Sequence, residues 1–191
     1  MRIGVDIDGT LADNLRAFVT AFNKVTGKNL TTDDIYDFDL SLVYGITPQE
    51  VEQVFHDHAE RVFARVPVMA GARNVLTKLK KAGVEIFVVT ARNPKFRELT
   101  TAWLKKNRLP VDHLIFEGDK GLACERFGLE LFIDDNLDNA LRVKNVGAVS
   151  LLMDAPYNRN VDPAIYGIKR IVRWPEMLAV AETLIRKRLS A

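Results

Sequence analysis

The sequence predicts an α/β fold in which a parallel sheet is sandwiched by helices. The first observation is that strand-like apolar runs alternate with helical patterns along most of the chain. The runs cover Ile3–Ile7, Val84–Val89, His113–Phe116, Leu129–Ile133 and Ala148–Leu152. Because parallel strands need long crossover connections, usually helices, this alternation predicts a Rossmann-like parallel sheet. The second observation is that residues 12–70 contain only helical patterns, which predicts a small helical cap inserted after the first strand.

Helices are expected between the strands and at the end of the chain, from apolar residues spaced three and four apart. They cover Ala72–Lys81, Pro94–Asn107, Lys120–Phe127 and Leu137–Asn145. Gly83 follows the lysines that end the first of these helices, a combination typical of a helix C-terminus. A last helix is expected to begin near Trp174, where Pro175 occupies the first turn.

The segment that interrupts the alternation contains three predicted helices. The first, Ala12–Val25, has an amphipathic pattern. Thr31–Asp34 offers an N-cap for a second, short helix, and Thr47–Glu50 has the capping-box pattern that opens a third. We therefore expect a catalytic core of residues 1–11 and 71–191 and a cap of residues 12–70.

Composition excludes several classes of protein. The chain has 27 basic and 25 acidic residues and a hydrophobic fraction of 48%, which is ordinary for a globular protein. A net charge of +2 favours neither a nucleic acid polymer nor a membrane as partner, and Arg186–Arg188 is typical of a helix C-terminus. The single cysteine, Cys124, fits a reducing compartment, and Met1 leads into the first strand without a signal peptide. We expect a cytoplasmic protein, monomer or homodimer.

The first strand ends in two carboxylates, Asp6 and Asp8, followed by Gly9 and Thr10. Side chains two apart on a strand lean the same way, so both carboxylates are expected to converge beyond the carboxyl end of the strand. Ligands bind at that edge of open α/β sheets. Two crowded carboxylates repel each other unless a proton or a cation relieves them, so the pair indicates a site.

Three further polar groups follow other strands: Thr90, Lys120 and the pair Asp134–Asp135. Taken singly, each has a structural explanation: Thr90 could cap the next turn, Lys120 could be a surface lysine, and Asp134–Asp135 could form an Asx turn. Together they lie at one edge of the predicted sheet. Several carboxylates beside a lysine and a hydroxyl indicate a Mg²⁺ site with an anion next to it.

In this order, the groups resemble the four motifs of the haloacid-dehalogenase-like (HAD) superfamily of phosphohydrolases. The motifs are Asp6-Ile7-Asp8-Gly9-Thr10, Thr90, Lys120 and Asp134-Asp135, and the resemblance covers residues 3–152. The chain is most similar to the 5′(3′)-deoxyribonucleotidase group and its bacterial relatives, through the small cap, the Val-Val-Thr-Ala-Arg form of the second motif and the adjacent aspartates. Animal members have Ser-Pro where this chain has Ala91–Arg92, which weakens the transfer of nucleotide specificity.

The resemblance implies a mechanism. Asp6 would attack phosphorus and form an aspartyl-phosphate, and Asp8 would protonate the leaving oxygen and then activate water. Mg²⁺ would be held by Asp6, the backbone carbonyl of Asp8 and Asp134, with Asp135 bound directly or through water. The other phosphoryl oxygens would be held by Thr90, the Ala91 amide and Lys120, with Gly9 leaving room for the phosphate.

A substrate pocket is expected from four residues: Arg92, Phe18, Tyr44 and Asn158. Arg92 could bind a second phosphate or a sugar, or simply pair with an acid. Phe18 and Tyr44 could stack on a base or form the core of the cap. Asn158 lies in a polar loop that could close the pocket.

The function predicted from these residues is Mg²⁺-dependent hydrolysis of a phosphomonoester, with a (deoxy)nucleoside monophosphate as the expected substrate. One alternative keeps the chemistry but takes a sugar phosphate or another small metabolite. Alternatives of another class are a receiver-like phosphoacceptor module and a catalytically silent binding protein.

Overall fold

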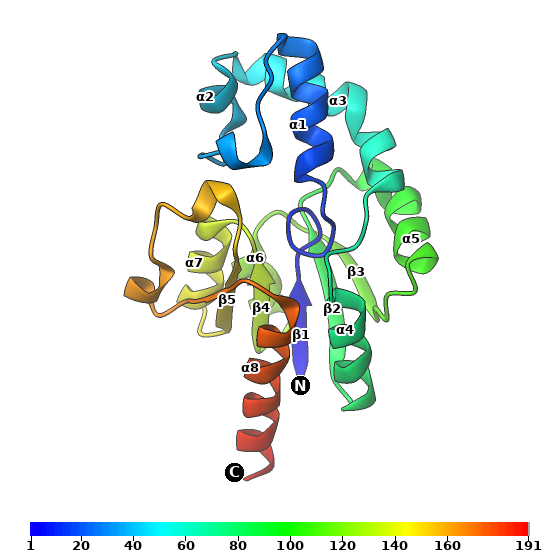
Figure 1. The fold of residues 1–191 in the computed structure, drawn as a ribbon. Helices are drawn as coiled ribbons and strands as arrows, with labels where there is room; N and C mark the ends of the chain where they lie inside the picture. Colours follow the sequence, from blue (N-terminus) through cyan, green and yellow to red (C-terminus); the bar gives the residue numbers. More distant parts are fainter. Residues whose placement is uncertain (191) are drawn as a thin grey trace.

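The computed structural model describes residues 1–190 and contains a parallel six-stranded sheet in the order β3-β2-β1-β4-β5-β6 (Figure 1). The strands are β1 (Arg2–Val5), β2 (Glu85–Thr90), β3 (His113–Phe116), β4 (Leu131–Asp134), β5 (Val149–Met153) and β6 (Lys169–Ile171). The fold therefore confirms the predicted α/β class. β1 lies between β2 and β4, so residues that follow these three strands share one edge of the sheet.

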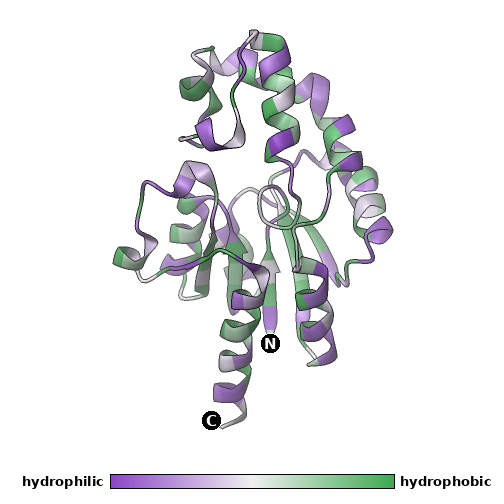
Figure 2. Cartoon of the chain, viewed as in Figure 1, coloured by the Kyte–Doolittle hydropathy of each residue, from purple (hydrophilic) through white to green (hydrophobic). Residues whose placement is uncertain are grey.

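Helices cover both faces of the sheet. The core helices are α4 (Ala72–Lys81), α5 (Arg97–Lys106), α6 (Lys120–Phe127), α7 (Leu137–Asn145) and α8 (Trp174–Leu189). One hydrophobic cluster joins β1 to residues of α4, α5 and α8, and a second joins Phe87 and Phe132 of the sheet to α6 and α7. The central strands are accordingly mostly hydrophobic, whereas the helices alternate hydrophilic and hydrophobic residues (Figure 2).

The segment after β1 forms a helical layer beyond the carboxyl ends of the strands (Figure 1). Its helices are α1 (Leu15–Thr26), α2 (Leu40–Tyr44) and α3 (Pro48–Arg65), with a single 3₁₀ turn at Thr32–Asp34. They pack around a separate hydrophobic cluster. The capping box expected at the start of α3 is present: Thr47 Oγ1 accepts from the Glu50 backbone N–H at 3.2 Å, and the Glu50 carboxylate accepts from the Thr47 N–H at 2.7 Å. The division into a core of residues 1–11 and 71–191 and a cap of residues 12–70 stays a prediction.

Two features of the sheet differ from the sequence-based expectation. The sixth strand, β6, was not predicted, because it has only three residues and two of them are Lys169 and Arg170. The first strand ends at Val5, two residues earlier than expected. Asp6 still donates its backbone N–H to Ile133 at 3.0 Å, but the chain then turns away from the ladder. Strand alternation therefore does not govern the direction of the Asp8 side chain.

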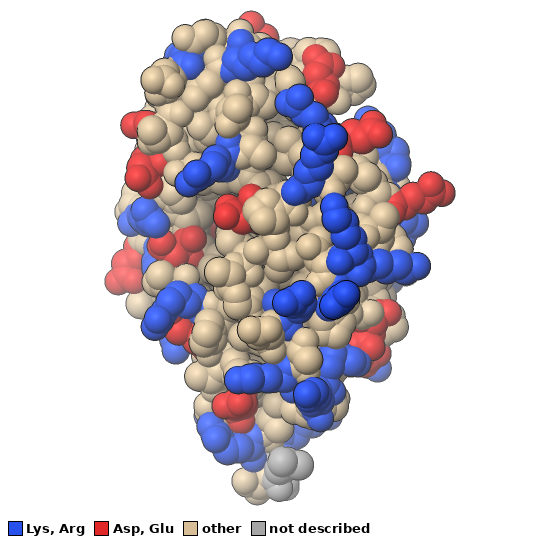
Figure 3. Space-filling model, turned by 45° about the vertical axis from the view of Figure 1, so that its right-hand side comes forward, with Lys and Arg blue, Asp and Glu red and all other residues tan. Residues whose placement is uncertain are grey.

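The surface carries charges of both signs. On the face shown in Figure 3, Lys and Arg side chains form a broken band that uncharged surface interrupts, with Asp and Glu beside it. Among residues 1–190, no helix is both long and apolar enough to cross a lipid bilayer.

Gly4 is required by the packing of the two central strands. A Cβ at this position would lie 2.1 Å from Cδ2 of Phe132 on β4. We expect Gly4→Ala to lower the free energy of unfolding by about 1–3 kcal/mol, measured by urea titration, because the Phe132 ring cannot shift freely in a packed core.

Phe132→Leu in the Gly4→Ala background should restore part of the loss, since it removes the ring that the new methyl group meets. Gly118→Ala is the matched control, because a Cβ there meets nothing within 4 Å. An unchanged urea midpoint for Gly4→Ala would contradict this account of the core.

Candidate active site

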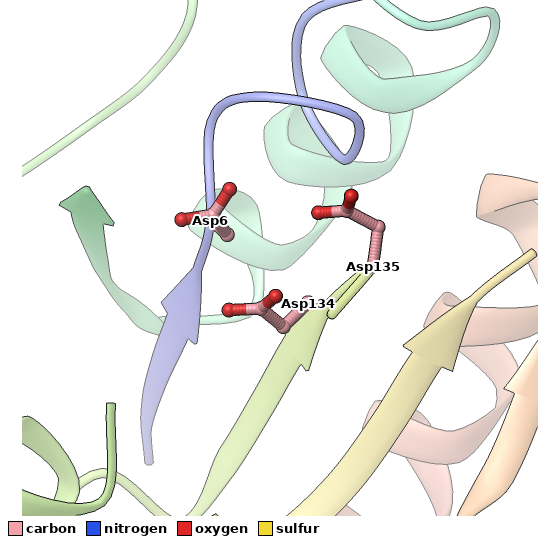
Figure 4. Close-up of side chains that lie close together, drawn as sticks. All are labelled: Asp6, Asp134 and Asp135. Atoms are coloured by element: carbon pink, nitrogen blue, oxygen red, sulfur yellow. The ribbon is translucent and has the colours of Figure 1, made fainter. Parts of the chain in front are cut away.

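Three carboxylates meet where β1 and β4 end (Figure 4). Asp6 follows β1, Asp134 is the last residue of β4, and Asp135 comes next in the chain. One oxygen from each carboxylate lies within 4.8 Å of the others, and all three residues are buried. The pairing of β1 with β4 brings together acids that are 128 positions apart in the sequence, which sequence spacing alone could not show.

The protonation of this acidic triad is perturbed. Burial is the main cause that raises the pKa of Asp6, Asp134 and Asp135, and it brings Asp135 to about 7. Negative charges on neighbouring carboxylates raise the three pKa values further. Oxygen donors that repel one another at this spacing are suited to a hard divalent cation, which would relieve the repulsion. The donor set therefore fits Mg²⁺.

Lys120 supplies the only positive charge that contacts the triad directly among the described residues. Its side chain is fully buried, and its Nζ lies 3.1 Å from Oδ1 of Asp6 and donates to the backbone oxygen of Glu117 at 3.1 Å. Lys120 begins α6, and Asp119 caps this helix. The structural explanation of Lys120 as a surface lysine is therefore wrong, and Asp6 is its anionic partner. Three carboxylates and one ammonium leave two negative charges when all are ionised, which matches a divalent cation.

Neighbouring polar groups fix the other two carboxylates. Thr10 Oγ1 donates to Oδ1 of Asp135 at 3.1 Å, and the hydroxyl of Tyr157 donates to the other oxygen. Asn139 Nδ2 donates to Oδ2 of Asp134 at 3.1 Å. Among the described residues, no buried side-chain nitrogen or oxygen lacks a partner. The triad is therefore held in place before any ligand binds.

The turn after β1 requires glycine. Gly9 has a φ of +80°, and a Cβ there would lie 2.4 Å from Oδ2 of Asp135 and 2.7 Å from the hydroxyl of Tyr157. The second motif lies beside this turn. Thr90 ends β2 and is buried, and its Oγ1 accepts the backbone N–H of Arg92 at 3.2 Å. Ala91 lines the same cavity as the acids.

Asp8 lies beside the acidic triad and is held by different groups. Its Oδ2 accepts from Nε of Arg92 at 2.8 Å, and its Oδ1 accepts from Nη2 of Arg92 at 2.6 Å and from Nδ2 of Asn14 at 2.7 Å. Asn14 also accepts the backbone N–H of Gly9 at 3.1 Å. Asp6 and Asp8 therefore share the cavity, while their side chains make separate contacts.

A cavity of about 520 Å³ lies between the acids and the cap, a volume typical of small-molecule sites. Its lining comprises Asp6, Asp8, Gly9, Asn14, Phe18, Phe38, Asp39, Leu40, Val51, Phe55, Phe63, Ala91, Asp134, Asp135, Asn136, Asn139 and Tyr157. Four of the acids, Asp6, Asp8, Asp134 and Asp135, come from the core, whereas the phenylalanines come from the cap, together with Asp39. One end of the cavity thus gathers four acids, and the other is mainly apolar with a single acid.

Of the four residues expected in the substrate pocket, only Phe18 lines this cavity. Tyr44 is buried in the cap, where its hydroxyl lies 3.3 Å from Oδ1 of Asn23. Asn158 is also buried and donates to the backbone oxygen of Asp135 at 2.8 Å, so it supports the loop that carries an acid. Arg92 forms an ion pair with Asp8, which agrees with the interpretation that it pairs with an acid.

The sequence did not predict several residues that line the cavity, among them Tyr157, Asn14 and Asn139. Tyr157 lies next to Asn158 in the same polar loop, and its neighbourhood to Asn158 was the signal that could have identified it. Asn14 and Asn139 carried a weak signal, since each lies within six residues of a motif aspartate. Asp138, in the first turn of α7, is exposed and does not line the cavity.

The family model and the curated relatives that match this chain are all described as nucleotidases. Residues 1–188 match the family described as "5' nucleotidase, deoxy (Pyrimidine), cytosolic type C protein". The chain is 32% identical to "Putative nucleotidase BH1399" of Halalkalibacterium halodurans, over 97% of this chain and 95% of the relative. It is 26% identical to a 5'(3')-deoxyribonucleotidase of Clostridium acetobutylicum, over 95% of each chain. A HAD family hydrolase from Deinococcus radiodurans, solved with bound phosphate and sodium, shares the fold with a TM-score of 0.68 at 18% identity over 95% of both chains.

The raised pKa values predict how stability depends on pH and Mg²⁺. From about pH 3.8 to about 7, Asp135 of the unfolded chain loses its proton while the folded protein retains it, so its contribution to stability falls as the pH rises. In EDTA, the melting temperature of the wild type should fall relative to Asp135→Asn across this window, because the variant lacks the carboxylate that titrates there. Mg²⁺ at 100 times its dissociation constant should then stabilise the wild type by about 2.7 kcal/mol.

Differential scanning fluorimetry at pH 5 and pH 8 measures both effects. The gain from Mg²⁺ should be larger at pH 8, where the carboxylates are ionised, and small in Asp134→Asn. A gain of equal size in wild type and variant would place the cation elsewhere.

Proposed function

Because the chain belongs to the family of cytosolic type C 5′-nucleotidases, within the HAD-like phosphohydrolases, we propose that it hydrolyses the phosphomonoester of a (deoxy)nucleoside monophosphate. The observation that carries the proposal is the cavity with the acidic triad and Asp8 at one end and aromatic side chains at the other. Such a cavity suits a ligand with a phosphate at one end and a flat apolar group at the other.

The chemistry proceeds in two displacements at phosphorus. A carboxylate oxygen of Asp6 attacks in line, the new O–P bond forms, and the bond from phosphorus to the ester oxygen breaks. Asp8 gives its proton to the departing oxygen, so the nucleoside leaves as a neutral alcohol. Asp8 then accepts a proton from water as the water attacks phosphorus. Inorganic phosphate departs and the Asp6 carboxylate is regenerated.

Cationic and hydrogen-bonding groups stabilise the phosphoryl oxygens. Lys120 holds Asp6 at 3.1 Å and is close enough to neutralise charge on the transferring group. The hydroxyl of Thr90, which ends β2, and the amide of Ala91, which lines the cavity, would donate to the remaining oxygens. Mg²⁺ would be held by the acidic triad and the backbone oxygen of Asp8, where it supplies positive charge that lowers the repulsion between carboxylate and phosphate.

The cap determines which leaving group fits. Phe18 and Phe55 lie edge to face with centroids 4.8 Å apart, and both line the cavity. A nucleobase placed there would stack on an aromatic wall, whereas a sugar phosphate without a base would leave the wall in contact with water. The family and the HAD hydrolase fold leave the receiver-like alternative without support.

The nucleophile is tested by Asp6→Asn. With p-nitrophenyl phosphate and Mg²⁺, the wild type should release nitrophenol and EDTA should abolish the reaction. Asp6→Asn should lose about 10⁴-fold or more of kcat, because an amide oxygen cannot form the covalent intermediate. Asp138→Asn, which changes an exposed acid four residues past Asp134, should retain full activity. Full turnover by Asp6→Asn would refute the assignment of the nucleophile.

The substrate is tested by comparing a deoxynucleoside 5′-monophosphate with 2-deoxyribose 5-phosphate, which lacks only the base. We expect kcat/KM to be at least about 10-fold higher for the nucleotide, because stacking contributes roughly 1–3 kcal/mol per base. Phe55→Ala should reduce this ratio by raising KM for the nucleotide alone. A ratio near one in the wild type would favour the sugar phosphate or another small metabolite as substrate.

A further inference from the structure

Arg92 is a buried arginine for which the two-step mechanism has no task. Its side chain is only 1% exposed. The guanidinium donates two parallel hydrogen bonds to Asp8, from Nε to Oδ2 and from Nη2 to Oδ1. This bidentate geometry is the strongest and most directional contact that an arginine makes with a carboxylate.

The other sides of the same guanidinium contact two further segments. Nη1 donates to Oγ1 of Thr100 on α5 at 3.3 Å. The Phe63 ring of α3, a cap helix, lies against the guanidinium, with 3.7 Å from Cζ of Arg92 to the ring centroid. Phe63 in turn packs against Phe18, which lines the cavity. Arg92 thus joins the loop after β1, a core helix and the cap.

We infer that Arg92 is a positioning residue that fixes the carboxylate of Asp8 for proton transfer and, through the face of Phe63, ties this carboxylate to the cap. The inference rests on the proposed function, because it assumes that Asp8 exchanges protons with the leaving group and with water. Arg92 itself touches neither substrate nor phosphate.

The contacts of Asp8 identify the oxygen that remains available. A carboxylate offers about four lone-pair positions. On Oδ1, Nη2 of Arg92 and Nδ2 of Asn14 occupy both, whereas on Oδ2 only Nε of Arg92 is bound. Oδ2 therefore has a free position, and the side chain of Asp8 is 32% exposed toward the cavity that it lines. Nε of Arg92 occupies one lone-pair position of Oδ2, and the other position of this oxygen is thereby directed to the substrate.

The same contacts argue against a role for Arg92 in substrate binding. Three of its N–H groups are already donated to Asp8 and Thr100, one face is covered by Phe63, and Arg92 does not line the cavity. A lysine could not replace it, because an ammonium group has neither the planar fork nor the flat face that stacks on a ring.

Dependence on the leaving group distinguishes a misplaced proton donor from a damaged fold. The value of kcat/KM reports phosphoryl transfer to Asp6. A nucleoside is a poor leaving group that needs the proton from Asp8, whereas p-nitrophenolate leaves without one. Arg92→Ala should therefore lower kcat/KM by about 10²-fold for a deoxynucleoside 5′-monophosphate, the scale of general acid catalysis, and by less than about 10-fold for p-nitrophenyl phosphate.

Three variants accompany this comparison. Arg92→Lys keeps the charge and should show the same unequal loss. Phe63→Leu removes the stacking face and should show it in weaker form, which tests the tie to the cap. Arg97→Ala is the matched control: Arg97 also stacks on a phenylalanine, with Cζ 4.4 Å from the ring centroid of Phe116, and its loss should leave the ratio of the two substrates unchanged.

A double variant separates positioning from substrate binding. In an Asp8→Asn background, Arg92→Ala should cause no further loss on the nucleotide, because no proton donor remains to be positioned. A further loss there would overturn the inference, and so would equal losses on both substrates for the single variant.

The proposed function fails in a different way from the inference. If the wild type hydrolyses neither substrate, or if Asp6→Asn is active, the proposed function is wrong. If the wild type and Asp6→Asn behave as expected and the leaving-group dependence of Arg92→Ala equals that of the wild type, only the inference about Arg92 is wrong. Melting temperatures of all variants show which of them remain folded at the assay temperature.

Discussion

The structure depends on one electrostatic constraint, the crowding of Asp6, Asp134 and Asp135 at the carboxyl ends of two adjacent buried strands. Burial and mutual repulsion both disfavour the ionised carboxylates, as their raised pKa values show. This arrangement lowers the stability of the fold, so stability alone does not explain it. The surrounding residues reduce the repulsion without removing it: Lys120 neutralises one charge, and Tyr157 donates a hydrogen bond to Asp135. The remaining negative charge is what a divalent cation would bind.

This constraint explains why small residues lie where the strands of the sheet meet the site. Gly4 leaves room for the Phe132 ring of β4 to lie against β1, and the register of β1 with β4 sets Asp134 beside Asp6. Gly9 turns the chain where any side chain would meet Asp135. The two glycines therefore both make room beside the acids. Gly4 admits the Phe132 ring between the strands that carry the acids and their covering helices, and Gly9 leaves space above Asp135.

The sequence predicts two kinds of feature in this structure. One is the alternation of strands and helices, and the other is the order of the charged motifs that follow the strands. Five strands follow from apolar runs, and the motif residues from Asp6 to Asp135 converge because parallel strands share an edge. It does not predict contacts decided by the loops. β6 is too short for a pattern, and the direction of Asp8 depends on Arg92, 84 positions away. Tyr44 shows the converse, since an aromatic residue suited to base stacking is occupied by packing within the cap.

The link from Asp8 through Arg92 to Phe63 gives a physical reason for placing a cap beside a core that already holds the acids. In the proposed mechanism, attack on phosphorus needs only groups at the carboxyl edge of the sheet, namely Asp6 after β1 and Lys120 at the start of α6. Proton transfer to the leaving group would instead be coordinated with the cap, the element proposed to recognise this group. Because one guanidinium contacts both Asp8 and Phe63, displacement of α3 would disturb the proton donor as well as the aromatic wall. Under the proposed function, recognition of the leaving group and its protonation are thus coupled through the side chain of Arg92.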